Sequence, residues 1–141
     1  MTERFMGVDY GVRRIGIAIG DTEVRIAMPL ATVEGTGEPT RDARRVADLG
    51  QEQEVAAFVV GLPLNMNSGE SEQTALTRRF AAELERLGGR PVHLQDERLT
   101  SFAAEETLRE VGAVDRRGRG LTDRIAAQKI LQDYLDRTQG R

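Results

Sequence analysis

The chain contains the stretch Arg4-Phe-Met-Gly-Val-Asp-Tyr10, followed by Gly11-Val-Arg-Arg14 and Ile15-Gly-Ile-Ala-Ile-Gly20. Two short apolar runs flank a turn that begins with glycine, which predicts two strands joined as an antiparallel hairpin. Asp9 stands at the end of the first strand. A carboxylate on a buried strand is costly unless it is hydrogen-bonded, paired or bound to a cation. Asp9 is therefore a candidate functional residue, and hydrogen bonding to the following turn is the alternative explanation.

Downstream of this hairpin, strand patterns alternate with helix patterns. Further strands are predicted at residues 27–33, 56–60 and 91–95. Helices are predicted from a Thr40 cap, along a stripe from Leu76 to Leu87, from a Thr100 or Ser101 cap, and over about residues 122–137. The first of these strands contains Pro29 and is expected at an edge. The order predicts an α/β fold with a five-stranded mixed sheet and helices on both faces, where sites form at the carboxyl ends of parallel strands.

Composition narrows the class of protein. The chain has 141 residues, of which 39% are hydrophobic and 30% charged, and a net charge of −3, so we expect a single domain over residues 1–141. It has neither an apolar run near the ~18 residues of a membrane span nor the apolar core of a signal peptide. We therefore expect a cytoplasmic protein without a membrane partner. His93, the single histidine, lies within a predicted strand and is interpreted as structural.

The absence of cysteine and the single histidine limit the metals that the chain can bind. Any metal must be held by oxygen ligands, which suits Mg²⁺, Mn²⁺ or Ca²⁺.

Asp123 is the most informative acidic residue of the chain. It precedes the apolar positions of the last predicted helix, which are Ala126, Ala127, Ile130, Leu131 and Tyr134. The helical spacing puts Asp123 on the same inward side as these residues, which a surface acid would have no reason to share. The alternative is an acid in the first turn that caps the helix or interacts with its dipole.

Glu97 follows the last predicted strand, with Asp96 directly before it. Because side chains alternate along a strand, only one of the two can face Asp9, and the pattern alone does not decide which. Either could also be a solvated loop acid. Three carboxylates drawn together repel each other unless cations bridge them. Two Mg²⁺ ions about 3.5–4 Å apart would activate water and stabilise the leaving oxygen of a phosphodiester.

Four motifs together resemble the YqgF/RuvX family of bacterial Holliday-junction-resolvase-like nucleases, which have an RNase H-like fold. They are Val8-Asp-Tyr-Gly-Val-Arg-Arg-Ile-Gly-Ile-Ala18, Gly61-Leu-Pro-Leu-Asn-Met66, Asp96-Glu-Arg-Leu-Thr100 and Asp123-Arg-Ile-Ala-Ala-Gln-Lys-Ile-Leu131. The motifs stand in the family's order and span nearly the whole chain. The resemblance implies that Asp9, Glu97 and Asp123 bind Mg²⁺ or Mn²⁺ and carry catalysis, and it favours Glu97 over Asp96.

The chain departs from the family pattern after Met66, where Asn67-Ser-Gly-Glu70 stands in place of an acidic residue followed by Gly-Ser/Thr-Glu. The fourth predicted strand also ends without an acid. Glu97, one strand farther out, must therefore reach across the end of the sheet, with Asn65 helping to position it. Gly11 is expected to form the tight turn that follows Asp9.

Arginine supplies all but one of the twenty basic residues, the exception being Lys129. Seven arginines lie in or beside the motifs. Six of them are expected to contact the phosphate backbone without reading sequence: Arg14, Arg98, Arg116, Arg117, Arg119 and Arg124. Solvated surface charge is the alternative. Aromatic residues make up only 4% of the chain, so a base-stacking platform is not expected. We expect branched or duplex nucleic acid instead.

The resemblance implies two substrates, DNA four-way junctions and the 5′ end of precursor 16S ribosomal RNA. Symmetric cleavage of a junction would require a homodimer. Our hypothesis is thus a metal-dependent endonuclease acting in DNA recombination and repair or in ribosomal RNA processing.

Two other functions remain open. The turn from Asp9 to Gly11 is also used by actin-like and sugar-kinase-like folds to hold nucleotide phosphates, so a phosphate-binding ATPase or kinase is one alternative. Such enzymes normally have a second domain, for which 141 residues leave no room. The other is a non-catalytic nucleic-acid-binding factor, which the presence of all three acids disfavours.

Overall fold

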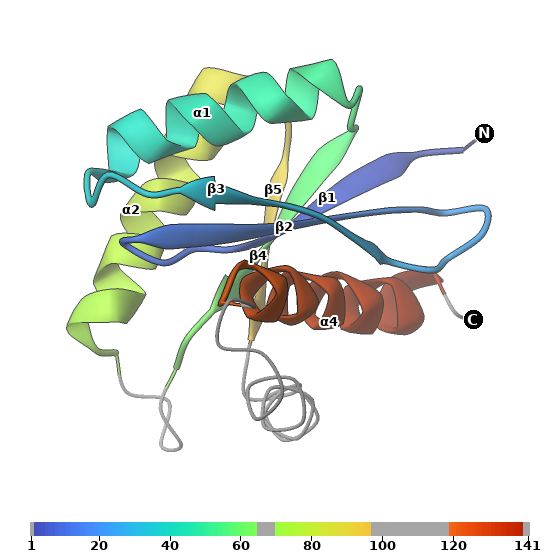
Figure 1. The fold of residues 1–141 in the computed structure, drawn as a ribbon. Helices are drawn as coiled ribbons and strands as arrows, with labels where there is room; N and C mark the ends of the chain where they lie inside the picture. The colour runs from blue at the N-terminus through green and yellow to red at the C-terminus, as the bar shows by residue number, and fades with distance from the viewer. Residues whose placement is uncertain (1, 65–69, 97–118, 140–141) are drawn as a thin grey trace.

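The computed structural model describes residues 2–64, 70–96 and 119–139 (Figure 1). Its elements are β1 Arg4–Asp9, β2 Arg14–Asp21, β3 Met28–Glu34, α1 Pro39–Glu52, β4 Ala57–Leu62, α2 Glu72–Gly88, β5 Val92–Asp96 and α4 Arg119–Gln139. The predicted hairpin and the alternation of strands and helices are confirmed. The helix predicted from Thr100 or Ser101 lies outside the described residues.

The five strands form one mixed sheet in the order β3-β2-β1-β4-β5. β1 pairs antiparallel with β2 and parallel with β4, and β4 pairs parallel with β5. β3 is an edge strand, as its proline predicted. The carboxyl ends of β1, β4 and β5 therefore meet at one end of the sheet, and β4 lies between β1 and β5.

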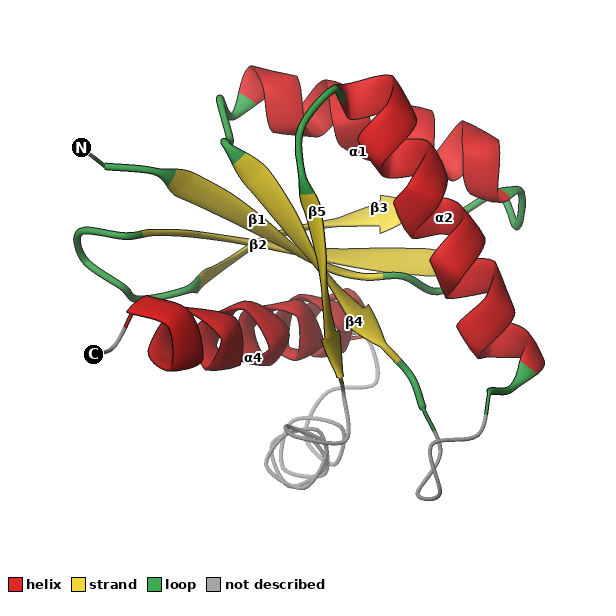
Figure 2. Ribbon diagram, turned by 180° about the vertical axis from the view of Figure 1, so that it is seen from behind, coloured by secondary structure: helices red, strands yellow, loops and turns green. Residues whose placement is uncertain are grey.

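Helices cover both faces of this sheet, as predicted. Figure 2 shows α1 and α2 on one face and α4 on the other. None of the helices within the described ranges is long and apolar enough to cross a membrane.

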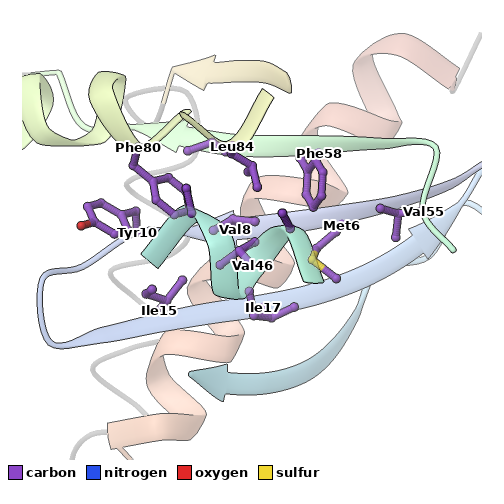
Figure 3. Packing of buried hydrophobic residues seen from close by; sticks show 13 residues of the cluster. Met6, Val8, Tyr10, Ile15, Ile17, Val46, Val55, Phe58, Phe80 and Leu84 are labelled. Atoms are coloured by element: carbon purple, nitrogen blue, oxygen red, sulfur yellow. The ribbon is translucent and has the colours of Figure 1, made fainter. Parts of the chain in front are cut away.

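The face under α1 and α2 carries the larger hydrophobic core (Figure 3). Its bulkiest members are fully buried and come from strands and helices alike: Met6, Ile15, Ile17, Phe58, Phe80 and Leu84. Burying an aliphatic or aromatic side chain of this size contributes about 1.5–3 kcal/mol. This core therefore supplies much of the free energy that holds the sheet against α1 and α2.

The face under α4 is built from smaller residues. Ala18, Ala27 and Ala57 pack there against Leu131 and Leu135 of α4. Gly7 also lies on this face, because a Cβ atom built on it would stand 2.7 Å from the Cβ atom of Leu131. Small strand residues thus allow α4 to lie close to the backbone of the sheet.

The start of α1 differs from the prediction. Glu38, not Thr40, is the N-cap, and its carboxylate accepts hydrogen bonds from the backbone N–H groups of Thr40 and Arg41. Pro39 occupies the first helical position, where its missing N–H group is not needed. The prediction of a Thr40 cap was wrong because it gave no weight to this proline.

Candidate active site

Asp9 is the last residue of β1 and lies on the face covered by α4. Along β1, Met6 and Val8 belong to the core under α1 and α2, whereas Gly7 faces α4. Because side chains alternate along a strand, Asp9 shares the face of Gly7. Its carboxylate therefore stands at the carboxyl end of a central strand, beneath α4.

Asp123 lies on the side of α4 that faces the sheet, as its spacing to Ala127 and Ile130 predicted, and its side chain is only 19% exposed. α4 begins at Arg119, before the predicted start at about residue 122, and has no acid in its first turn. The alternative of a first-turn acid serving the helix dipole is therefore wrong. Ala126 and Tyr134 of the predicted stripe are only half-buried.

Gly16 brings Asp9 and Asp123 together. It is the Cα partner of Asp9 in the antiparallel pairing of β1 and β2. A Cβ atom built on Gly16 would stand only 1.9 Å from the backbone oxygen of Asp123, so α4 rests directly on this residue. Such strand partners have Cα atoms about 4.5–5.5 Å apart, which makes Asp9 and Asp123 neighbours across one glycine.

Arg14 contacts Asp123 from the same strand. Its Nε atom donates a hydrogen bond of 2.8 Å to Oδ2 of Asp123, and the arginine side chain is 42% exposed. Arg14 precedes Gly16 by two residues and therefore lies on the same face of β2. Hydrogen bonds between an arginine and a carboxylate are charge-assisted and stronger than neutral ones. Asp123 is thus held through its backbone at Gly16 and through its side chain at Arg14.

Tyr10 fixes the end of β1 from the other face of the sheet. Its hydroxyl donates to Oδ2 of the buried Asp42 at 2.9 Å, and Oδ1 of Asp42 accepts from the backbone and hydroxyl of Thr36. The Tyr10 ring also stacks on Phe80, with ring centroids 4.2 Å apart. Burial, together with the bond to Asp42, raises the pKa of Tyr10 far above its ordinary value, so this hydroxyl stays protonated.

The hairpin turn after Asp9 requires a glycine at position 11. A Cβ atom on Gly11 would stand 2.6 Å from the backbone oxygen of Arg14. The predicted tight turn is therefore confirmed, and it sets Arg14 at the start of β2 on the far side of the turn from Asp9.

The other predicted arginines are only partly described. Nη1 of Arg124 donates to the hydroxyl of Thr32 at 3.3 Å, which links α4 to β3. The backbone of Arg119 starts α4. Several predicted site residues lie outside the described residues: Asn65, Glu97, Arg98, Arg116 and Arg117.

Asp96, the competitor of Glu97, is not brought together with Asp9. Gln95 is fully buried and bonds to Asp133 and Arg137 of α4, so it lies on the α4 face. Alternation along β5 puts Asp96 on the opposite face. His93 stacks on Tyr134 with ring centroids 5.4 Å apart, which agrees with its predicted structural role.

The donors that converge at the end of β1 suit a hard cation. Asp9 and Asp123 offer carboxylate oxygens, the ligands that Mg²⁺ and Mn²⁺ prefer. Across residues 2–64, 70–96 and 119–139, no group of three acidic or histidine side chains gathers to hold a metal. Of the three predicted carboxylates, Asp9 and Asp123 lie in the described part of the chain and Glu97 lies outside it.

Sequence reasoning missed Gly16 and Asp42. The first had a visible signal, because Gly16, Ala18 and Gly20 alternate with isoleucines and predict one face of small residues. Asp42 lies in the first turn of α1, where an acid is common and gives no sign of a distant partner. Its bond to Tyr10 joins residues distant in the chain, and no local pattern predicts it.

Comparison with known proteins identifies the family. The model of the RuvX family, described as Holliday junction resolvase, matches residues 3–137. A protein of Chloroflexus aggregans is 44% identical over 134 residues, covering 95% of this chain and 94% of the relative. A protein of Anaeromyxobacter dehalogenans is 46% identical over 134 residues, covering 95% and 97%. Both relatives carry the name "Putative pre-16S rRNA nuclease".

A solved structure supports the fold. RuvC of T. thermophilus, in complex with a Holliday junction substrate, matches with a TM-score of 0.64 and 17% identity, covering 98% of this chain and 96% of that one. This likeness confirms the expected RNase H-like fold. The match of the family model over residues 3–137, with the two relatives of 44% and 46% identity, shows that the chain belongs to the RuvX family.

Proposed function

We propose that this chain is a metal-dependent endonuclease that hydrolyses phosphodiester bonds in structured nucleic acid. The observation that carries this proposal is the approach of Asp9 and Asp123 across Gly16, at the carboxyl end of a central strand. Membership of the RuvX family supports the same activity.

In this proposal, Asp9 and Asp123 hold Mg²⁺ or Mn²⁺ together with Glu97, the residue that directly follows β5. Such ions, when bound, activate water and stabilise the leaving oxygen of a phosphodiester. The chain's own residues fix the carboxylates in place. Tyr10 anchors the strand end that carries Asp9, and α4 rests on Gly16 so that Asp123 stands beside it.

The arginines near the acids would position the phosphate backbone of the substrate. Arg14 and Arg124 lie beside Asp123 in the described part of the chain. Arg98, Arg116, Arg117 and Arg119 are assigned the same role from the sequence. Contacts to phosphates set the register of a nucleic acid without reading its bases, so we expect recognition by shape.

The first substrate to test is the 5′ end of precursor 16S ribosomal RNA, because relatives that match over almost their whole length carry that name. The second is a DNA four-way junction, which the description of the matching family favours. We propose that residues 1–141 act as one domain in the cytoplasm. Symmetric cleavage of a junction would require two copies of the chain.

The test compares the wild type with Asp9→Asn on labelled precursor RNA, four-way junction and linear duplex, with Mg²⁺, Mn²⁺ or EDTA. We expect metal-dependent cutting that falls by about a hundredfold or more in Asp9→Asn, since loss of a metal ligand removes several kcal/mol of transition-state stabilisation. Asp48→Asn, which changes an exposed acid on α1, is the matched control and should cut normally.

Two outcomes would overturn the proposal. ATP turnover without cutting would favour a phosphate-binding ATPase or kinase. Binding of nucleic acid by both proteins, with cutting by neither, would favour a non-catalytic factor.

A further inference from the structure

We propose that Arg14 is a positioning residue of the cation site. It holds one oxygen of Asp123 so that the carboxylate keeps a fixed orientation and its other oxygen can bind a divalent cation. The inference rests on the proposed function, because it takes Asp123 as a cation ligand.

The contact is made through a single pair of atoms. Nε of Arg14 bonds to Oδ2 of Asp123 at 2.8 Å. A guanidinium can instead grip a carboxylate with two parallel bonds that occupy both oxygens. The single bond to Oδ2 leaves Oδ1 of Asp123 out of the hydrogen bond to Arg14.

The choice of partner is specific. Glu34 on β3 is the Cα partner of Arg14, so the register of the strands alone would favour an ion pair between these two residues. Among the residues that the structure describes, however, the ion pair of Arg14 is with Asp123. Asp123 is the less exposed acid and has its backbone oxygen fixed over Gly16. Arg14 therefore restrains a side chain whose backbone is already in place.

The positive charge of Arg14 also matters for the two nearby carboxylates. Asp9 and Asp123 repel each other in the absence of a cation, which would turn the Asp123 carboxylate away. The positive charge of Arg14 offsets this repulsion and keeps the carboxylate beside Asp9. Removing a group that hydrogen-bonds to a metal ligand in this way typically lowers the metal affinity by about 10- to 100-fold.

The experiment measures Mn²⁺ binding to the full chain by calorimetry, without nucleic acid. Arg14→Gln is expected to weaken Mn²⁺ binding about tenfold or more. Arg14→Lys should restore part of the affinity because it keeps the charge. Arg13→Gln removes the neighbouring arginine and is the matched control, with unchanged binding. Thermal unfolding checks that each variant is folded, and Arg14→Met replaces Arg14→Gln if the latter does not fold.

Unchanged or tighter Mn²⁺ binding by Arg14→Gln would overturn the inference, since Arg14 would then be a bystander or a competitor of the cation. Asp9→Asn and Asp123→Asn separate this failure from that of the proposed function. If both weaken Mn²⁺ binding and Arg14→Gln does not, only the positioning role is wrong. If neither weakens it, the proposed cation site is wrong as well.

Discussion

The two faces of the sheet are packed in different ways. Under α1 and α2, large side chains such as Phe58 and Phe80 fill the space between strands and helices. Under α4, glycine and alanine bring the helix close to the strand backbones, most closely at Gly16. Both candidate acids, Asp9 and Asp123, lie on the α4 face.

This difference shows how one sheet serves two purposes. Bulky side chains provide burial, but they fill the space between helix and strands and hold the helix backbone away from the sheet. A glycine at the contact point gives up burial and allows a helix backbone to touch a strand. We conclude that the α1 and α2 face mainly stabilises the fold, and that the α4 face mainly sets the geometry of the site.

The largest expected effect is a loss of stability without a loss of activity, from a substitution on the face under α1 and α2. Phe58→Ala removes a buried ring at the end of the sheet away from Asp9 and should lower the free energy of unfolding by about 3–5 kcal/mol. Urea unfolding measures this loss. Cleavage per folded molecule should stay near the wild-type rate, and a large fall in that rate would break the comparison between the two faces.

The next effect comes from the contact between α4 and the sheet. Gly16→Ala places a Cβ atom 1.9 Å from the backbone oxygen of Asp123, so α4 must move and carry Asp123 with it. We expect a loss of about 1–3 kcal/mol in unfolding free energy, typical of overpacking, together with a marked loss of cleavage and of Mn²⁺ binding.

Gly88→Ala is the matched control for this change. A Cβ atom on Gly88 would meet the Phe58 ring at 3.4 Å, an ordinary contact, and Gly88 ends α2 on the other face. We expect its stability to stay within about 1 kcal/mol of the wild type, or to rise, with normal cleavage. Normal cleavage by folded Gly16→Ala would contradict the role assigned to this contact.

The smallest effect is a change of stability with pH, and it concerns the polar cluster formed by Gln95, Asp133 and Arg137 on the α4 face. Burial raises the pKa of Asp133, an effect that the nearby Arg137 partly opposes. A raised pKa in the folded protein means that Asp133 contributes most to stability below its ordinary pKa, and that this contribution is lost as the pH rises through the folded value.

The free energy of unfolding of the wild type, minus that of Asp133→Asn, should therefore fall from about pH 3 to about pH 7. The fall should be less than about 1 kcal/mol, because the group is partly solvated. Urea unfolding of both proteins across this range measures it. A difference that grows with pH would contradict the assigned direction.

Much of the fold could be predicted from local patterns. The β-branched runs around Gly11 predicted the hairpin, and Pro29 predicted the edge strand. The spacing of Asp123 to Ala127 correctly predicted its sheet-facing side, because helical periodicity is a local property. The start of α4 at Arg119 was missed, since the residues before Asp123 carry no distinct capping signal.

The contacts that build the site were harder to predict. The bond between Arg14 and Asp123 joins β2 to the last helix and depends on the packing of α4, which no local pattern encodes. The face on which Asp96 lies also depended on a long-range contact, because the orientation of Gln95 became visible only from its bonds to α4. Long-range geometry therefore decides the site, while local periodicity decides the elements that carry it.

The central claim is that Asp9 and Asp123 share a divalent cation at the carboxyl end of β1. Anomalous diffraction from a crystal of the full chain grown with Mn²⁺ tests it most directly. We predict an ion in contact with carboxylate oxygens of both residues, at the distances of about 2.0–2.2 Å typical of small divalent cations. Mn²⁺ bound elsewhere, with the two carboxylates turned away from each other, would contradict the account.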